Sequence, residues 1–153
     1  MSGLDLKVPP PIVSAAVAVV AYLASKWLPG QSVHIPAALF VAVTLGAAGM
    51  AVNIAGLWSF RRHRTTVNPL RPANASALVT DGIFAWTRNP MYLGMVLMMS
   101  GWTIWLANIV AFLGPPLLAI YLTRFQILPE ERILKENFGD ALTEYEGRVR
   151  RWI

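Results

Sequence analysis

Cysteine is absent from the 153-residue chain, so disulfides, thiolate metal ligands and cysteine nucleophiles are excluded together. Charged residues are scarce: they make up 14% of the chain, against 56% hydrophobic residues, and the mean hydropathy is +0.51. A typical soluble domain carries about 25% charged residues. The composition therefore predicts an integral membrane protein that contacts the lipid bilayer.

Long apolar runs predict about four transmembrane helices, because a helix needs roughly 17 to 25 residues to cross the hydrocarbon core. The last run, from residue 91 to 128, is too long for one helix and must contain a turn. We place this turn at Ala107-Asn108, where Asn108 would cap the next helix, and expect Gly114-Pro115-Pro116 to kink that helix. The expected helices span about residues 11–28, 35–60, 91–106 and 109–128.

Two polar segments complete what we expect to be a single membrane domain spanning the whole chain. Residues 61–89 form an Arg-rich loop that is too apolar to be a disordered linker. In residues 129–153, Leu142, Tyr145 and Val149 recur at helical spacing, which predicts an amphipathic helical segment on the membrane surface. The predicted fold class is an all-α integral membrane protein with a cytoplasmic C-terminal helical segment.

The distribution of basic residues predicts the orientation. Five of the thirteen Lys and Arg residues lie between residues 61 and 88, and six lie from Arg124 onward. Lys7 precedes the first helix, and only Lys26 falls on the other side. Because cytoplasmic loops are enriched in Lys and Arg, we expect both termini in the cytoplasm. The net charge is +5, but the basic residues flank apolar runs and do not indicate a nucleic-acid partner.

Two predicted helix starts contain the candidate functional residues. Asn89-Pro90 would begin the third helix, with the Asn side chain as cap and Pro at the first helical position. Pro129 would begin a new helix with Glu130 and Glu131 in its first turn, a place where the helix dipole alone favours acidic residues. Because the third and fourth helices form a hairpin, both starts are expected at one membrane face. Together they predict a pocket.

The expected pocket has a distinctive inventory of chemical groups. It offers backbone donors at two helix starts, two carboxylates, arginines and the ring of Tyr92. The sequence around it contains no metal-ligand set and no Gly-rich phosphate loop. These groups suit a zwitterionic, cationic ligand better than a nucleoside triphosphate, and we expect no bound metal.

These motifs resemble a known signature. The run Arg88-Asn89-Pro90-Met91-Tyr92-Leu93-Gly94, followed by Glu130-Glu131, is similar to the signature of the isoprenylcysteine carboxyl methyltransferase and phospholipid methyltransferase superfamily. Phe138-Gly139, Tyr145 and Arg148-Val149 resemble the run that follows in the family. The resemblance extends over residues 65–149 or so, and its first part is similar to many bacterial members. It therefore implies a bacterial inner membrane as the location.

The resemblance implies a methyltransferase that uses S-adenosylmethionine (SAM), with a cofactor site formed by the third and fourth helices and the C-terminal segment. The acceptor would enter from the lipid. Carried over to this sequence, one wall of the cofactor site would contain Asn89, Pro90, Tyr92 and Gly94 beside Arg88, and the other wall Glu130 and Glu131.

Methyl transfer is an in-line displacement that needs alignment and the exclusion of water rather than a nucleophilic side chain. Tyr92 can face the sulfonium through a cation–π contact, and Arg88 or Arg124 can hold the negative charge of an acceptor. These three residues are therefore the expected catalytic residues. Interfacial anchoring explains Arg88 equally well.

Three functions remain open. A carboxylate or thiol of an amphipathic or lipid-linked acceptor is favoured, because an amine near pKa 10 needs a base and His34 and His63 are poorly placed. The alternative substrate is a phospholipid amine. The third possibility is a non-catalytic membrane protein that binds a partner, since Asn89 stands where His is common in the family. No motif defines an oligomeric state.

Overall fold

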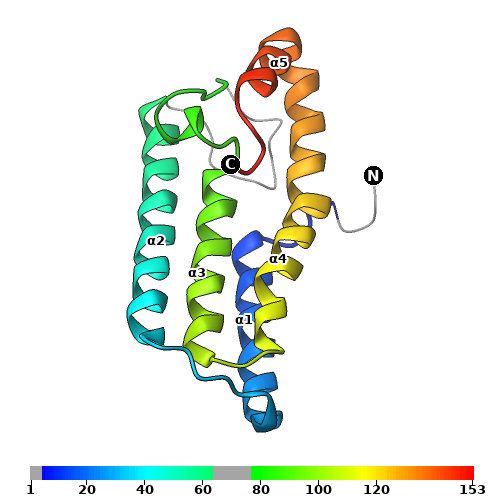
Figure 1. Ribbon diagram of the computed structural model, residues 1–153. Helices are drawn as coiled ribbons and strands as arrows, with labels where there is room; N and C mark the ends of the chain where they lie inside the picture. Colours follow the sequence, from blue (N-terminus) through cyan, green and yellow to red (C-terminus); the bar gives the residue numbers. More distant parts are fainter. Residues whose placement is uncertain (1–4, 64–76) are drawn as a thin grey trace.

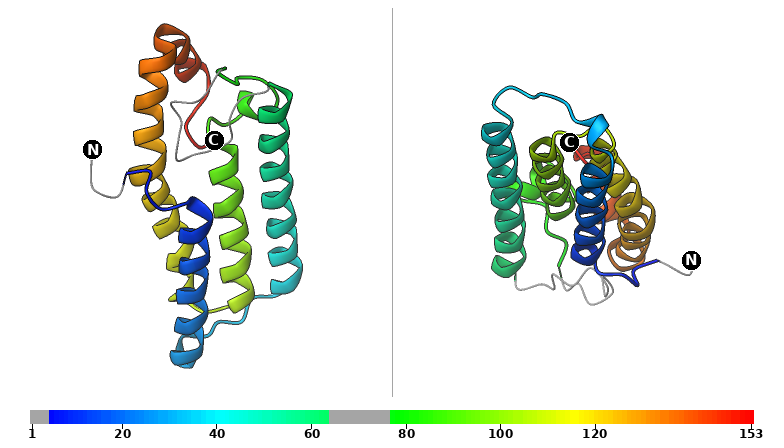
Figure 2. Two further views of the ribbon diagram at one scale, coloured as in Figure 1. Left: turned by 180° about the vertical axis from the view of Figure 1, so that it is seen from behind. Right: turned by 90° about the horizontal axis from the view of Figure 1, so that it is seen from below.

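The computed structural model of the chain describes residues 5–63 and 77–153. These ranges are helical, with one isolated β-bridge between Ser32 and Asn108. In chain order the α-helices are α1 (Pro10–Trp27), α2 (Ala38–Arg62), α3 (Pro90–Leu106), α4 (Gly114–Leu122) and α5 (Leu128–Arg148). Helix α3 lies between α2 on one side and α1 with α4 on the other (Figures 1 and 2). The predicted all-helical fold class is confirmed.

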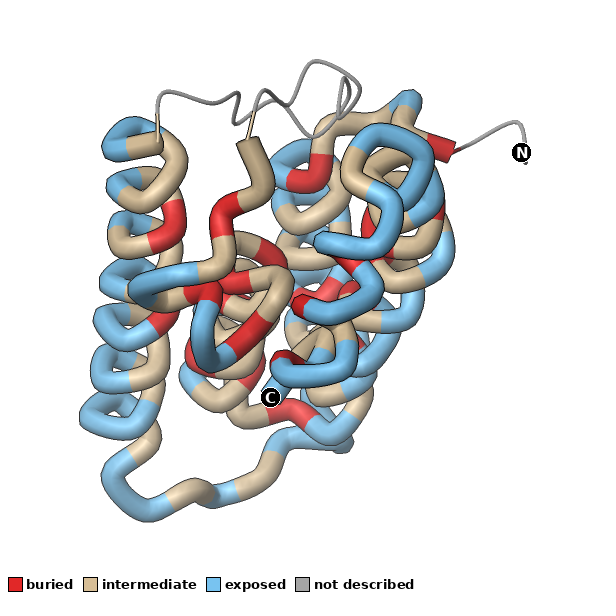
Figure 3. Tube along the Cα trace, turned by 90° about the horizontal axis from the view of Figure 1, so that it is seen from above, coloured by how far each residue is buried: buried red, intermediate tan, exposed pale blue. Residues whose placement is uncertain are grey.

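The outer faces of the bundle are apolar. Large side chains such as Val20, Phe40 and Ile120 are exposed, and buried positions turn inward (Figure 3). Lipid tails accommodate such faces, whereas a water-soluble monomer rarely exposes extended apolar patches. Within the described part of the chain, three helices are long and apolar enough to cross a membrane, and α3 is a shorter apolar helix. The chain is therefore a multi-pass integral membrane protein.

At the end of the bundle opposite α5, the two turns between helices hydrogen-bond to each other. The Val33 N–H donates to Ala107 O at 2.8 Å, and the Ile109 N–H donates to Gln31 O at 3.0 Å. These bonds hold residues 31–35 outside any α-helix, so α2 begins at Ala38 rather than near residue 35. It also continues to Arg62, two residues beyond the expected end.

The turn between α3 and α4 is organised by Asn108. Its carboxamide oxygen accepts the Val110 N–H at 3.0 Å, and its amide nitrogen donates to Leu28 O at 3.0 Å. A short 3₁₀ turn (Ala111–Leu113) follows, and α4 begins at Gly114. Gly114-Pro115-Pro116 therefore begins α4 and does not kink it. The N–H groups of a first turn have no partner within the helix, so prolines there cost no hydrogen bond.

Pro129 also differs from its expected role. Helices α4 and α5 are joined by a π-helical turn (Thr123–Ile127), and Ile127 has helical dihedral angles, so no separate helix starts at Pro129. A proline in a helix interior removes one hydrogen bond and its ring crowds the carbonyl four residues earlier. The π-turn relieves this crowding and lets the helix continue.

The C-terminal segment is not one straight helix. Helix α5 extends the line of α4 beyond the other helices, then bends sharply and folds back (Figure 1). The bend is at Gly139, whose φ of 49° lies in the left-handed region that glycine tolerates best. The apolar residues expected to face the membrane, Leu142, Tyr145 and Val149, instead pack against Val79 and Phe84.

Helices α2 and α3 approach closely at glycines. A Cβ atom built on Gly49 would lie 2.6 Å from Gly94 O and 2.7 Å from the Met98 side chain. Gly46 has no such neighbour within 4 Å of a built Cβ. A side chain at Gly49 would therefore collide with α3, whereas a side chain at Gly46 would meet open space.

Replacing Gly49 by Ala should destabilise the bundle, because overpacking a tight contact costs about 1–3 kcal/mol. Gly46→Ala is the matched control, since both changes bring the same gain in helix propensity. The measurement is the thermal unfolding midpoint in detergent. Equal midpoints for the two variants would contradict the close α2–α3 contact.

Candidate functional site

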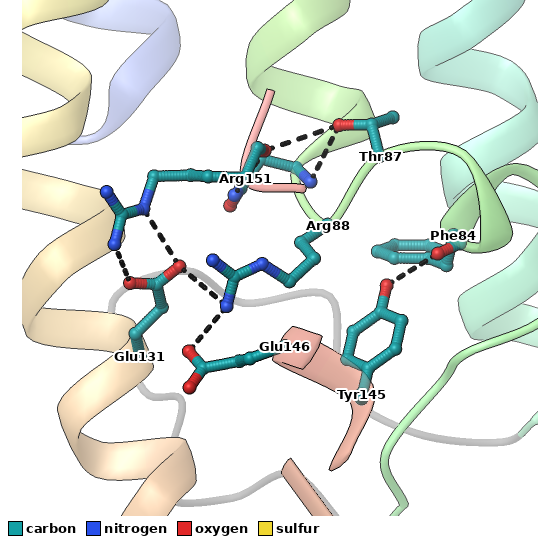
Figure 4. Close-up of polar contacts among 8 residues, drawn as sticks. Phe84, Thr87, Arg88, Glu131, Tyr145, Glu146 and Arg151 are labelled. Atoms are coloured by element: carbon teal, nitrogen blue, oxygen red, sulfur yellow. Dashed lines mark hydrogen bonds and ion pairs between the residues drawn. The ribbon is translucent and has the colours of Figure 1, made fainter. Parts of the chain in front are cut away.

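Four charged side chains gather where α3 begins. Arg88 pairs with Glu131 at 3.2 Å and with Glu146 through a short contact, and Arg151 binds Glu131 with two bonds of 3.1 and 2.8 Å (Figure 4). We call Arg88, Glu131, Glu146 and Arg151 the charged cluster. Its two guanidinium and two carboxylate groups cancel in formal charge. Each member is paired, which offsets part of the cost of removing it from water.

The C-terminal tail (residues 149–153) returns to the start of α3 and completes this site. The Arg88 N–H donates to Arg150 O at 3.1 Å, and the Asn89 side-chain amide donates to Arg151 O at 3.0 Å. Asn89 therefore binds the tail and does not cap α3 with its side chain, as the sequence had suggested. The backbone N–H of Asn89 donates to the hydroxyl of Thr87 at 3.2 Å.

Glu130 points to a different neighbour from Glu131. The Tyr92 hydroxyl donates to a Glu130 carboxylate oxygen at 3.0 Å. The Tyr92 side chain is buried in an apolar cluster with Leu118, Leu122 and Ile127, against which Trp152 of the tail also packs. Glu130 thus meets the apolar interior at its edge, while Glu131 joins the charged cluster.

The π-turn explains why both carboxylates face α3. A regular helix repeats its inward face about every 3.6 residues. Here the fully buried positions after Leu122 are Gln126 and Ile127, four and five residues further on, so the buried face shifts by one residue across the π-turn. Glu130 and Glu131 follow Ile127 at helical spacing and lie on the same face. The extra residue therefore rotates the acidic pair toward α3.

The structure brings together most of the residues that the sequence singled out. Arg88, Asn89, Tyr92, Glu130 and Glu131 lie at one end of α3 and α5. The other three predicted site residues make contacts elsewhere. Pro90 packs on Gly56, Gly94 faces α2, and Arg124 lies 3.7 Å from Asp5 with its side chain half exposed.

Sequence reasoning missed four residues of the site, namely Thr87, Glu146, Arg151 and Trp152. Their roles depend on the bend at Gly139 and on the return of the tail. The only signal was the Arg148-Val149 run, where α5 ends and the tail begins.

Two features describe the electrostatics of the charged cluster. The hydrogen bonds to Glu131 raise the pKa of the Arg151 guanidinium, so this group stays protonated at any physiological pH. The Nε atom of Arg88 is buried and has no hydrogen-bond partner among the described residues. A buried unpaired N–H costs about 1–3 kcal/mol, so an acceptor at this position would be favourable.

The site belongs to a multi-pass membrane protein with acidic and basic groups at one end of the bundle. A family model for phospholipid methyltransferases matches residues 37–141. The chain therefore belongs to the phospholipid methyltransferase family, whose members use SAM.

Two relatives extend this result. The chain is 41% identical over 63 residues to an uncharacterized protein of Haemophilus influenzae, an alignment that covers 41% of this chain and all of the relative. It is 37% identical over 75 residues to the protein-S-isoprenylcysteine O-methyltransferase of Schizosaccharomyces pombe. That alignment covers 47% of this chain and 30% of the yeast enzyme. No solved structure matches the chain.

Replacing Arg151 by Met should loosen the tail, because Glu131 loses a pair of charge-assisted hydrogen bonds. We expect a loss of about 1–2 kcal/mol, less than for a fully buried pair because Arg151 is partly exposed to solvent. Arg150→Met is the matched control: its side chain is exposed, and its backbone carbonyl is retained. The measurements are the unfolding midpoint and hydrogen exchange of the Arg88 amide. Unchanged exchange in Arg151→Met would show that the ion pair does not hold the tail.

Proposed function

We propose that this chain is a SAM-dependent methyltransferase that transfers a methyl group to a carboxylate or thiolate of an amphipathic or lipid-linked acceptor. One observation carries the proposal. The carboxylates of Glu130 and Glu131 contact Tyr92 and Arg88, respectively, at the polar end of an apolar bundle. Family membership supplies the reaction class.

The residues fit the chemical groups of SAM. The cofactor carries an ammonium group, ribose hydroxyls and a carboxylate beside its sulfonium centre. Glu130 and Glu131 suit the ammonium or the hydroxyls, and the unpaired Nε of Arg88 suits the carboxylate. The ring of Tyr92 is held in place by its bond to Glu130 and suits a cationic sulfonium.

When bound, the cofactor supplies an electrophilic methyl group. The carbon–sulfur bond breaks as a bond to the acceptor oxygen or sulfur forms, and a neutral thioether leaves. The chain has to orient the two reactants and exclude water, which contributes up to several powers of ten in rate. Trp152 and the tail close the polar side of the site against the Tyr92 cluster. An acceptor carboxylate is already ionised at neutral pH, so no protein base is required.

A phospholipid amine is the second candidate acceptor, favoured by the description of the matching family. An ammonium acceptor must first lose a proton. His63 is not placed to take it, because its ring contacts Ser59 O and lies 3.5 Å from Asp81, away from Glu130. A carboxylate or thiolate therefore fits the described residues better. The yeast relative is named for O-methylation of an isoprenylcysteine protein, which agrees with this preference.

We further propose that the end of the bundle with the charged cluster faces the cytoplasm of a bacterial inner membrane. Arg88, Arg148, Arg150 and Arg151 all lie at this end, and cytoplasmic ends are enriched in Arg and Lys. An amphipathic acceptor would then keep its apolar part in the bilayer and present its polar end to the site.

The test of cofactor binding is calorimetry of SAM and S-adenosylhomocysteine with the detergent-purified protein. We expect a Kd on the order of 1–100 μM, weakened about 10- to 100-fold in Glu130→Gln and Glu131→Gln, because each removes a charged partner. Glu144→Gln is the matched control, since this exposed carboxylate pairs only with Arg148 among the contacts described. Folded wild-type protein that binds neither ligand would favour the non-catalytic alternative.

The acceptor class is tested with methyl-labelled SAM and membranes that contain the protein. Methyl esters release labelled methanol in base, whereas N-methyl groups do not. We expect base-labile label or label on sulfur in the lipid extract or in membrane proteins. Base-stable label on phospholipid headgroups would establish the amine alternative.

A further inference from the structure

The N-terminal segment (residues 5–9) contacts the helix that carries the acidic pair. It runs from the start of α1 to the junction of α4 and α5 (Figures 1 and 2). The Leu6 N–H donates to Phe125 O at 3.0 Å, and the Gln126 side-chain amide donates to Val8 O at 2.8 Å. Asp5 lies 3.7 Å from Arg124. All three contacts fall within the π-turn.

These contacts meet a specific need of the backbone. In an α-helix the carbonyl of residue 125 would accept the N–H of residue 129, but residue 129 is proline and has none. The Leu6 N–H takes that place. An unpaired backbone carbonyl in an apolar environment is costly, so the N-terminal segment stabilises the π-turn directly.

Gln126 is the side chain that ties the two elements together. It is fully buried, and its amide nitrogen donates to Val8 O. A polar side chain buried in this way costs about 1–3 kcal/mol when its partner is removed. Gln126 is also only four residues from Glu130, so a change in the π-turn would rotate the acidic pair.

We propose that Gln126 is a positioning residue: together with the N-terminal segment it holds the π-turn, and the π-turn sets the rotation at which Glu130 and Glu131 face α3. The effect of this arrangement on cofactor binding rests on the proposed function. Its effect on the helix does not. Loss of the contact leaves the π-turn free to change its geometry, which turns the carboxylates away from Tyr92 and Arg88.

The first test is hydrogen exchange of the backbone amides of residues 123–131 in the full-length protein in detergent. Gln126→Met keeps the size of the side chain but removes the donor, and Asp5→Ala loosens the segment without altering the helix. We expect exchange at least 10-fold faster in both variants. Thr123→Val is the matched control, because the Thr123 hydroxyl bonds within its own helix to Ala119 O. Exchange equal to that of the control would overturn the proposal whether or not SAM binds.

The second test separates positioning from a general loss of stability. SAM affinity is measured for Gln126→Met, for Glu130→Gln/Glu131→Gln and for the combined variant. If Gln126 acts through the carboxylates, its replacement weakens binding about 10-fold in wild type and adds no further loss to the carboxylate variant. Losses that multiply would assign Gln126 a merely structural role. Absence of SAM binding in wild type would reject the proposed function, and the exchange test would still decide the positioning role.

Discussion

The proline at position 129 is the constraint on which the functional end of this protein depends. It stands inside a helix that continues from the 3₁₀ turn before α4 to Arg148, and a proline there leaves the carbonyl of Phe125 without its helical donor. The helix responds with one extra residue per turn between Thr123 and Ile127. That residue rotates everything after it, and the acidic pair comes to face α3. Short π-helical insertions of this kind are frequent at functional sites.

The charged cluster holds together segments that are far apart in the sequence. Arg88 precedes α3, Glu131 and Glu146 belong to the two halves of α5, and Arg151 belongs to the tail. Removing one partner would leave an unpaired charge with limited access to water, so each ion pair keeps its two segments together. The same groups that hold the fold at this end also supply the candidate ligands of the cofactor.

The two segments that hold the site in position lie outside the region that matches the family. The matched residues 37–141 include α2, α3, α4 and the acidic pair. The N-terminal segment and the tail, which hold the π-turn and the start of α3, are beyond it on either side. The central hairpin thus carries the groups proposed for chemistry. The two ends of the described chain hold those groups in position.

The sequence by itself determined the class of fold, because apolar runs of this length in lipid must satisfy their backbone groups as helices. It also marked Arg88, Tyr92, Glu130 and Glu131, since motif and hairpin topology place them at one membrane face. Only the tertiary structure decided which way these side chains point. Arg124 turns toward Asp5, Asn89 binds the tail, and Arg151 joins Glu131, because a π-turn and a left-handed glycine redirect the chain. The sequence permits both the π-turn and the bend at Gly139, but distant contacts select them. The N-terminal segment contacts the π-turn, and the residues after the bend pack against Val79 and Phe84.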